Sequence, residues 1–206
     1  MTLPSVDSID CREALPSSCP DMQQEFQDLS RFRVPPGFRG RSGPVVLLWQ
    51  LVQSTLFGFS PQPFYGWRRS LLRLFGAKIG RNVLLRPTAR IAFPWKLEIG
   101  DFSWIGDHVE LYSLDRITIG SHAVVSQRSY LCTASHDMSD LAFSYLTGPI
   151  VVGDQVWLAS DVFVAPGVTI GRGAVVGTRS TVFGDIPPEQ VAFGEPARVM
   201  RKRRQS

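Results

Sequence analysis

Three histidines are the side chains in this sequence best suited to proton transfer near neutral pH, and they lie 14 residues apart at His108, His122 and His136. Histidine acts as a general base or as a zinc ligand, so the three together admit two kinds of site. His136 belongs to the string LCTASHD and stands just before a long segment that breaks the surrounding pattern. Such a histidine can project from a rigid element into a loop-covered cleft, which favours the role of base.

The other reactive side chains exclude several kinds of chemistry. Cys11, Cys19 and Cys132 are an odd number without a CxxC pair, so neither a disulfide framework nor a thiolate zinc site is expected. The sequence contains no glycine-rich P-loop and no paired-carboxylate signature. The first 30 residues lack a signal-peptide pattern, and the apolar stretch 45–59 is shorter than the roughly 20 residues of a bilayer span. These features predict a cytoplasmic protein.

The charge is distributed unevenly along the chain. The 206 residues carry 22 Lys and Arg and 18 Asp and Glu, for a net charge of +4, and 44% hydrophobic residues exclude a largely disordered chain. Residues 1–30 have a net charge of −5, residues 31–78 carry eight basic and no acidic residues, residues 79–187 sum to −2, and the last 19 residues sum to +3. Because the central part is slightly acidic, no nucleic-acid partner is expected.

An internal repeat decides the expected fold. From Ile79 onward an aliphatic residue recurs every six positions, and fifteen such hexads form five coils of three. The departures from six residues, of 8, 8 and 21, fall in the third hexad of a coil and therefore stack at one corner. A hexad with one inward aliphatic side chain suits a short strand and a turn. The repeat predicts a mainly β fold, a parallel β-helix, in which glycine after the aliphatic residue serves a tight corner.

This pattern divides the chain into segments. They are a flexible acidic tail (1–30), a basic N-terminal helical module (31–78), the hexapeptide-repeat β-helix (79–187) with an inserted loop (135–151), and a basic C-terminal tail (188–206). Helices are expected over 45–59 and 64–77 within the basic module. That module either lies on a membrane surface or covers the open end of the β-helix.

The sequence also resembles a known family. The hexads and the strings FRVPPGFRGRSG, SPQPFYGWRRSLLRLFGAKIG, LCTASHD and VWLASDVFVAPGVTIGRGAVVG resemble the left-handed β-helix acyltransferases of the hexapeptide-repeat superfamily, and within it the colanic acid biosynthesis O-acetyltransferases. The resemblance covers about residues 30–203. It implies a left-handed parallel β-helix of about five coils, a homotrimer, and acetyl-CoA as co-substrate.

The resemblance also implies roles for individual residues. His136 takes the position of the catalytic base. The residues that match an acetyl-CoA groove between neighbouring subunits are Trp157, Ser160, Gly177 and Thr178, and those that match a basic pair on the CoA phosphates are Arg198 and Arg201. Trp157 also aligns by column with Trp104, so a packing role outside the groove stays open for it. Guanidinium groups suit phosphate. Phe183 and Gly184 stand where many relatives have Thr-Lys, so one cationic contact is missing.

Several points around His136 stay open at the level of sequence. Its orienting acceptor is Asp115, Asp137 or a group from a lower coil, where the column offers Gly106. Lys96 and Arg116 stack in the same column as His136, and a nearby cation would keep the imidazole neutral. The acceptor is expected to meet residues 139–148 together with Tyr112 and Asp115. The three histidines fall on different faces of their coils, so no metal site is expected.

The function predicted from these residues is acetyl-CoA-dependent O-acetylation of a sugar hydroxyl in exopolysaccharide or surface-glycan synthesis. Acyl transfer to another small hydroxyl or amine is the second possibility, and a non-catalytic trimeric β-helix scaffold is the third. A sugar or glycan acceptor, two further copies of the chain and a peripheral membrane contact through residues 31–78 are the expected partners.

Overall fold

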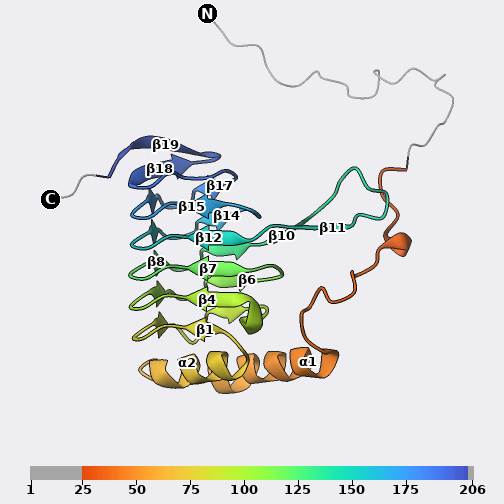
Figure 1. The fold of residues 1–206 in the computed structure, drawn as a ribbon, viewed down its shortest axis with the longest axis horizontal. Helices are drawn as coiled ribbons and strands as arrows, with labels where there is room; N and C mark the ends of the chain where they lie inside the picture. Colours follow the sequence, from red (N-terminus) through yellow and green to blue (C-terminus); the bar gives the residue numbers. More distant parts are fainter. Residues whose placement is uncertain (1–24, 204–206) are drawn as a thin grey trace, which may run out of the picture.

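The computed structural model describes residues 25–203, and these form a stack of triangular coils with a layer of helices at one end (Figure 1). The helical elements are η1 (Leu29–Arg31), α1 (Gly43–Val52), the π-helical turn η2 (Gln53–Phe57), α2 (Tyr65–Leu74) and η3 (Pro94–Lys96). Among the described residues no helix combines the length and the apolar character that a membrane crossing requires. The predicted acidic tail lies mostly outside the described residues.

Three sheets form the walls of the coils, and all their strands are parallel except β19. The first contains β1 (Lys78–Ile79), β4 (Leu97–Ile99), β7 (Ile117–Ile119), β12 (Ile150–Val152) and β15 (Thr169–Ile170). The second contains β2 (Leu84–Leu85), β5 (Trp104–Ile105), β8 (Val124–Val125), β13 (Trp157–Leu158), β16 (Val175–Val176), β18 (Gln190–Gly194) and β19 (Ala197–Lys202). The third contains β3 (Arg90–Ile91), β6 (Glu110–Tyr112), β9 (Tyr130–Cys132), β14 (Phe163–Val164) and β17 (Thr181–Val182). These sheets confirm the predicted β-helix.

The core is the ladder of aliphatic residues that the hexads predicted. All fifteen opening residues are buried, as Val152, Leu158 and Val164 of the fourth coil illustrate at 1% exposure or less. Equivalent strands pair in register, so that Ile99 lies beside Ile119 and Val152 beside Ile170. Each coil alone would leave its aliphatic residues open above and below, so the stack is stabilised by contacts between neighbouring coils.

The glycines that follow the aliphatic residues have a different role from the one expected. They have ordinary φ angles, and the positive φ of each corner falls two residues later, for example at Phe102 (59°) and His122 (56°). A Cβ on Gly100 would instead lie 2.5 Å from the backbone nitrogen of Ser121 in the next coil. Glycine is therefore required because neighbouring coils approach closely, and not because the corner itself is tight.

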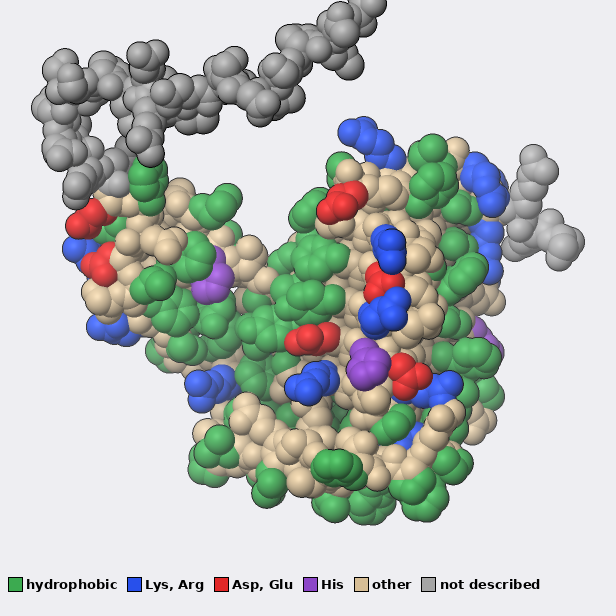
Figure 2. All heavy atoms as spheres, turned by 180° about the vertical axis from the view of Figure 1, so that it is seen from behind, with side chains coloured by type: hydrophobic (Ala, Val, Ile, Leu, Met, Phe, Trp, Pro, Cys, Tyr) green, Lys and Arg blue, Asp and Glu red, His purple; other side chains and the backbone are tan. Residues whose placement is uncertain are grey.

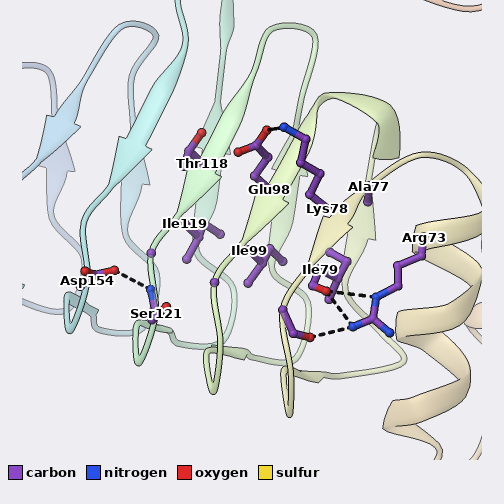
Figure 3. A pocket seen from close by; sticks show the side chains of 13 residues that line it. Arg73, Ala77, Lys78, Ile79, Glu98, Ile99, Thr118, Ile119, Ser121 and Asp154 are labelled. Carbon is purple, nitrogen blue, oxygen red and sulfur yellow. Dashed lines mark hydrogen bonds and ion pairs between the residues drawn. The ribbon is translucent and has the colours of Figure 1, made fainter.

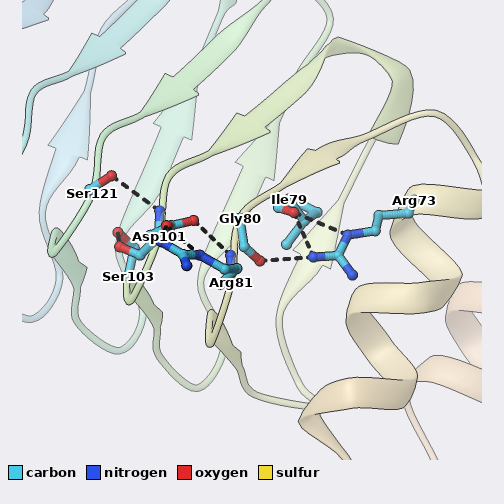
Figure 4. Close-up of polar contacts among 7 residues, drawn as sticks. All are labelled: Arg73, Ile79, Gly80, Arg81, Asp101, Ser103 and Ser121. Atoms are coloured by element: carbon cyan, nitrogen blue, oxygen red, sulfur yellow. Dashed lines mark hydrogen bonds and ion pairs between the residues drawn. The ribbon is translucent and has the colours of Figure 1, made fainter.

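Polar side chains link the corners of successive coils (Figure 4). Asp101 accepts the backbone N–H of Arg81 at 2.7 Å, Ser121 accepts that of Asp101 at 3.1 Å, and Asp154 accepts that of Ser121 at 2.7 Å. The N–H and guanidinium of Arg81 hold the pKa of the Asp101 carboxyl below its usual value. A short acceptor side chain in each coil thus satisfies a turn amide in the coil below.

The helical module covers the open end of the β-helix at β1 (Figure 1). Arg68 donates to the Leu85 carbonyl at 2.7 Å, Arg69 to that of Val83 at 3.0 Å, and Arg73 to those of Ile79 and Gly80. These carbonyls belong to the first coil, which has no coil beneath it to donate backbone N–H groups. Part of the basic excess in residues 31–78 therefore has a structural cause.

The C-terminal segment continues the β-helix, which corrects the prediction of a basic tail after Pro187 and Pro188. β18 pairs in parallel with β16, with Val191 beside Val175, and β19 folds back antiparallel on β18. Ala192 of β18 pairs with Val176 and is fully buried. The hairpin thus covers the last coil, opposite the end that the helices cover (Figure 1).

Candidate active site

The inserted loop is a β-hairpin that projects from the corner between the third and the first sheet. β10 (Ala134–His136) pairs antiparallel with β11 (Tyr145–Thr147), and His136 lies directly opposite Tyr145. At the tip, Asp137 accepts the N–H of Ser139 at 2.8 Å and Asp140 accepts that of Ala142 at 3.0 Å. Hydrogen bonds from Ser139 and Ser144 lower the pKa of Asp137 and Asp140, respectively. These bonds give the tip a defined shape.

The N-terminal segment packs along this hairpin, which the sequence did not predict. The N–H of Asp28 donates to the Leu141 carbonyl at 2.7 Å, and the Phe32 ring lies 5.9 Å from the His136 ring and 5.2 Å from the Tyr145 ring, centroid to centroid. Together these segments form a lobe beside the coils (Figures 1 and 2). His136 is therefore held between two parts of the chain.

The His136 imidazole is fixed by stacking and by one hydrogen bond. Its centroid lies 4.3 Å from that of Phe143, nearly parallel, and 4.7 Å from that of Tyr145. Nδ1 lies 2.7 Å from the Phe143 carbonyl oxygen. Because a carbonyl can only accept, Nδ1 carries a proton, so in the neutral ring the lone pair is on Nε2. This is the tautomer that a general base acting through Nε2 would need.

The group that accepts the hydrogen bond from Nδ1 and orients the His136 ring is thus a backbone carbonyl. The sequence had left this group unassigned. The two carboxylates considered for this role are engaged elsewhere. Asp115 accepts the N–H of Arg116 at 2.6 Å, and Asp137 accepts both the N–H and the hydroxyl of Ser139. The sequence analysis missed the aromatic residues around His136, for which the only signal was the presence of Phe143 and Tyr145 two positions apart in the inserted loop.

Lys96 shares a corner with His136 but turns its ammonium group away from the imidazole. Its Nζ donates to the Phe38 carbonyl at 2.7 Å and to the Leu114 carbonyl, and it lies over the Phe38 ring. Burial lowers the pKa of Lys96, and the nearby Asp115 carboxylate opposes this effect. The rings of Phe38 and Tyr145 stack between Lys96 and His136. The predicted cation beside the base is therefore screened by two aromatic rings.

Tyr112 lines a cavity of about 550 Å³ next to His136, which we name the aromatic cavity. Its lining includes Phe38, Arg39, Gln50, Phe93, Tyr112 and Tyr145. Burial raises the pKa of the Tyr112 hydroxyl. Asp115, the other predicted acceptor contact, is not part of this lining. The structure thus brings Tyr112 to the site and leaves Asp115 beside Lys96.

The predicted donor residues gather at a different corner, between the second and the third sheet. Trp157 lies outward on β13, 47% exposed, and its Nε1 donates to Ser126 Oγ at 3.1 Å. Ser160 follows β13, and its carbonyl accepts the N–H of Arg179 at 3.0 Å. Gly177 follows β16, and a Cβ there would lie 2.8 Å from Phe193 Cβ. Thr178 is exposed beside it.

Arg198 and Arg201 lie on β19 of the same sheet as Trp157. Arg198 is opposite Phe193 and Arg201 is opposite Val191 in the antiparallel pair, and both side chains are exposed. β19, β18, β16 and β13 are consecutive in the sheet. The six predicted donor residues therefore lie on neighbouring strands and turns, whereas β9, β14 and β17 separate them from His136 within one chain.

A second cavity, of about 570 Å³, lies on the first sheet next to the helices (Figure 3). Lys78 and Glu98 form an ion pair there, Arg73 donates to the carbonyls of Ile79 and Gly80, and Asp154 accepts the N–H of Ser121. These contacts tie the charged side chains of the cavity to neighbouring coils and to the helices. Within residues 25–203, no three His, Cys, Asp or Glu residues lie close enough to hold a metal ion.

Comparison with known sequences identifies the family of this chain. The family described as bacterial transferase hexapeptide (six repeats) matches residues 149–184. The putative colanic acid biosynthesis acetyltransferase WcaF of Escherichia coli K12 is 58% identical over 178 residues, which cover 86% of this chain and 98% of the relative. The galactoside O-acetyltransferase of the same organism is 30% identical over 141 residues, or 66% of this chain and 68% of the relative.

Solved structures agree with this assignment. A hexapeptide-repeat acetyltransferase of Vibrio cholerae in complex with acetyl-CoA has a TM-score of 0.72 and 28% identity, covering 81% of this chain and 92% of its own. A galactoside acetyltransferase in complex with CoA has a TM-score of 0.73 and 26% identity, covering 83% of this chain and 84% of its own. Together with the repeat, the β-helix and the 58% identity over most of the chain, these matches show that the chain belongs to the hexapeptide-repeat acetyltransferases.

Proposed function

We propose that this protein transfers the acetyl group of acetyl-CoA to a sugar hydroxyl during the synthesis of an exopolysaccharide or surface glycan. The observation that carries the proposal is the His136 imidazole, whose Nδ1 donates to the Phe143 carbonyl and thereby leaves Nε2 as the lone-pair atom of the neutral ring. Relatives named as acetyltransferases of colanic acid biosynthesis and of galactosides support the sugar acceptor. Solved relatives in complex with acetyl-CoA and CoA support the donor.

The proposed reaction uses His136 twice. Nε2 takes the proton of the acceptor hydroxyl while the hydroxyl oxygen attacks the carbonyl carbon of the thioester and forms the new C–O bond. The tetrahedral intermediate then collapses, the C–S bond breaks, and the imidazolium returns the proton to the CoA sulfur. The products are the O-acetyl sugar and CoA. The stack of Phe143 and Tyr145 holds the imidazole in one orientation for both proton transfers.

We assign the CoA site to Trp157, Ser160, Gly177, Thr178, Arg198 and Arg201. Small residues at the corner between the second and third sheets leave room for the pantetheine chain, and the exposed guanidinium groups on β19 suit the CoA phosphates. The third sheet separates this corner from His136 within one chain. A complete site therefore needs a donor corner from one copy of the chain and the hairpin from another, which supports a homotrimer.

A panel of variants tests the proposed base. His136→Ala should lower kcat for acetyl transfer to a sugar acceptor by about 10²–10⁴-fold. His122→Ala is the matched control, because His122 is an exposed corner residue that stacks on Phe102, with centroids 5.2 Å apart. Full activity of the His136→Ala protein would remove the base from the mechanism. Absence of activity in the unaltered protein across sugar, serine and amino-sugar acceptors would favour the scaffold alternative.

A peripheral membrane contact is part of the same proposal, and its surface is the outer side of the helix layer. We name this surface the end face, and its exposed side chains are Leu48, Leu51, Leu56, Phe59, Phe64, Trp67 and Leu74. Four of them, Leu56, Phe59, Phe64 and Trp67, line one pocket. Exposed apolar side chains that cluster in this way mark an interaction site. Within residues 25–203, only Arg31 and Lys78 of the basic module have a carboxylate partner, so the module keeps an excess of positive charge. An anionic bilayer at the cytoplasmic face fits both features.

Vesicle sedimentation tests this contact. The double variant Leu51→Ser with Phe59→Ser should lose most binding to vesicles that contain phosphatidylglycerol. Phe183→Ser, which alters an equally exposed side chain far from the helices, should bind like the unaltered protein. If the double variant binds vesicles as well as the unaltered protein does, the end face is not the membrane contact. If the oligomer mass of the double variant falls, the end face binds a second copy of the chain instead.

A further inference from the structure

The β-hairpin that carries His136 is not part of the three sheets of the coils. Its strands β10 and β11 pair with each other and form a two-stranded sheet of their own. A two-stranded hairpin by itself is marginally stable in water, so its geometry depends on what packs against it. Among the described residues, the rings from outside the hairpin that lie against its aromatic side chains are those of Phe32 and Phe38. The position of the hairpin therefore depends on the N-terminal segment.

The two rings have different positions. Phe38 stacks on Tyr145 with centroids 4.6 Å apart and lies beneath the ammonium group of Lys96, so it ties the hairpin to the first coil. Phe32 meets Tyr145 edge-on at 5.2 Å and also lies 5.9 Å from His136, centroid to centroid. Edge-on and tilted arrangements of this kind are favourable for aromatic rings. Within residues 25–203, Phe32 is thus the one ring from outside the hairpin that lies against the imidazole.

The backbone that carries Phe32 is a short turn with its own anchors. Asp28 accepts the N–H of Ser30 at 3.0 Å and its hydroxyl at 2.6 Å. Arg33 donates to the carbonyls of Ser30 and Phe32, each at 2.8 Å. The N–H of Asp28 donates to the Leu141 carbonyl at the tip of the hairpin, at 2.7 Å. These bonds give the turn a defined shape and join it to the hairpin, so the Phe32 ring is presented from a fixed position.

The position of the imidazole decides which of its nitrogens is reactive. Nδ1 of His136 donates to the Phe143 carbonyl, at 2.7 Å, only while the ring keeps its place in the hairpin. A neutral imidazole that leaves this bond exchanges its proton between the two nitrogens, and in water it carries the proton mainly on Nε2. A ring with its proton on Nε2 has no lone pair there and cannot take the proton of a hydroxyl. Loosening of the ring therefore lowers the fraction of protein in the reactive form.

We propose that Phe32 is a positioning residue for the acetyl transfer, and that its contacts keep the His136 imidazole in the bond to the Phe143 carbonyl. Phe32 acts through the imidazole and takes no part in the proton transfer itself. This inference rests on the proposed role of His136 as the base. It adds that the reactive tautomer of a residue on the inserted hairpin depends on a ring more than 100 positions earlier in the chain.

Acetyl-transfer kinetics test the effect on the reaction. Phe32→Ala should lower kcat about tenfold, because small displacements of a catalytic group reduce the rate strongly. The KM for acetyl-CoA should not change, since the proposed donor residues lie at another corner of the coils. Phe32→Tyr keeps the ring and should retain most of kcat. Phe26→Ala is the matched control, because Phe26 belongs to the same segment, is 78% exposed and stacks on no other ring within residues 25–203.

The tautomer of His136 is read independently of activity. Nuclear magnetic resonance of protein labelled with ¹⁵N at its three histidines distinguishes a proton on Nδ1 from one on Nε2, and His136→Ala identifies the signals of His136. At a pH where the ring is neutral, the unaltered protein should show the Nδ1–H form, and Phe32→Ala should show an increased share of the Nε2–H form. A purely structural role of Phe32 would lower Tm and leave the tautomer as it is.

An unchanged kcat or an unchanged tautomer in Phe32→Ala would overturn the inference. So would an equal loss of kcat in Phe26→Ala. The tautomer measurement needs neither acceptor nor acetyl-CoA, so the two proposals can fail separately. If Phe32→Ala changes the tautomer while His136→Ala keeps full activity, Phe32 positions the ring and the proposed base is wrong.

Discussion

Arg68 offers a test of how the helices hold the β-helix. Its side chain is completely buried and donates to the Leu85 carbonyl at 2.7 Å, to Ser60 Oγ at 2.7 Å, and to the carbonyls of Pro61 and Gln62 at 2.9 and 2.5 Å. Burial lowers the pKa of this guanidinium, whose positive charge is met by oxygen dipoles. The residue therefore joins the loop before α2 to the edge of the first coil.

Arg68→Met keeps much of the volume and removes all of these donors. A hydrogen bond from a charged donor contributes about 1.5–3 kcal/mol, and an orphaned buried acceptor costs about 1–3 kcal/mol. The carbonyls of the exposed Pro61 and Gln62 can turn to water, and methionine adds apolar burial, so the net loss of unfolding free energy should be about 2–4 kcal/mol. For a chain of this size that loss lowers Tm by about 4–16 °C.

Thermal unfolding followed by circular dichroism measures this loss, at one protein concentration because oligomerisation contributes to the apparent stability. Arg69→Met is the control, since Arg69 lies on the same helix, is half-buried and makes one bond, to the Val83 carbonyl. It should cost about 1.5 kcal/mol, the lower end of the range for a charged donor, because this single bond is only partly buried. If the two variants differ by less than about 0.5 kcal/mol, the buried guanidinium does not hold the helices to the coils, and our account of the basic module fails.

Two further predictions concern the donor corner and the coil corners. Thr178→Trp fills the proposed pantetheine groove and should raise the KM for acetyl-CoA about tenfold or more. Because Thr178 is exposed, Tm should not fall. An unchanged KM would mean that the pantetheine chain binds elsewhere. The pKa of the Asp101 carboxyl is lower in the folded protein than in the unfolded chain. Its contribution to the free energy of unfolding is therefore complete above the unfolded pKa of about 3.9, and it is lost as the pH falls through the folded pKa. Asp101→Asn should therefore show a smaller loss of stability between pH 5 and pH 2 than the unaltered protein, and equal acid titrations would contradict this assignment.

The coils were predictable because each hexad acts locally. One buried aliphatic residue per six positions fixes which side chain of each short strand faces inward, and the same pattern recurs in every coil, as at Ile99 and Ile119. The C-terminal hairpin was missed for the opposite reason. The run of basic residues around Arg201 suggested a solvated tail, although Val191 and Ala192 continue the aliphatic pattern of the ladder and Gly194 permits a reversal.

The surroundings of His136 were only partly predictable. The position of the histidine at the start of the insertion indicated a base, but its partner is the carbonyl of Phe143, and any residue type supplies a carbonyl. Which carbonyl meets Nδ1 depends on the pairing of His136 with Tyr145 across the hairpin. The position of Lys96 likewise depends on Phe38, which is 58 residues away in the chain. No local pattern contains that information.

The sequence by itself determined the repeat and the corner at which insertions gather, because a six-residue period constrains every strand in the same way, and it singled out His136 at that corner as the candidate base. Only the tertiary structure decided how the basic module is used, why the second glycine of a hexad is needed, and which groups surround the base. Each of these depends on close approach between residues far apart in the chain: Arg68 at the Leu85 carbonyl, Gly100 against Ser121, and Phe38 on Tyr145. Such contacts form only when the coils are stacked and both ends of the stack are covered.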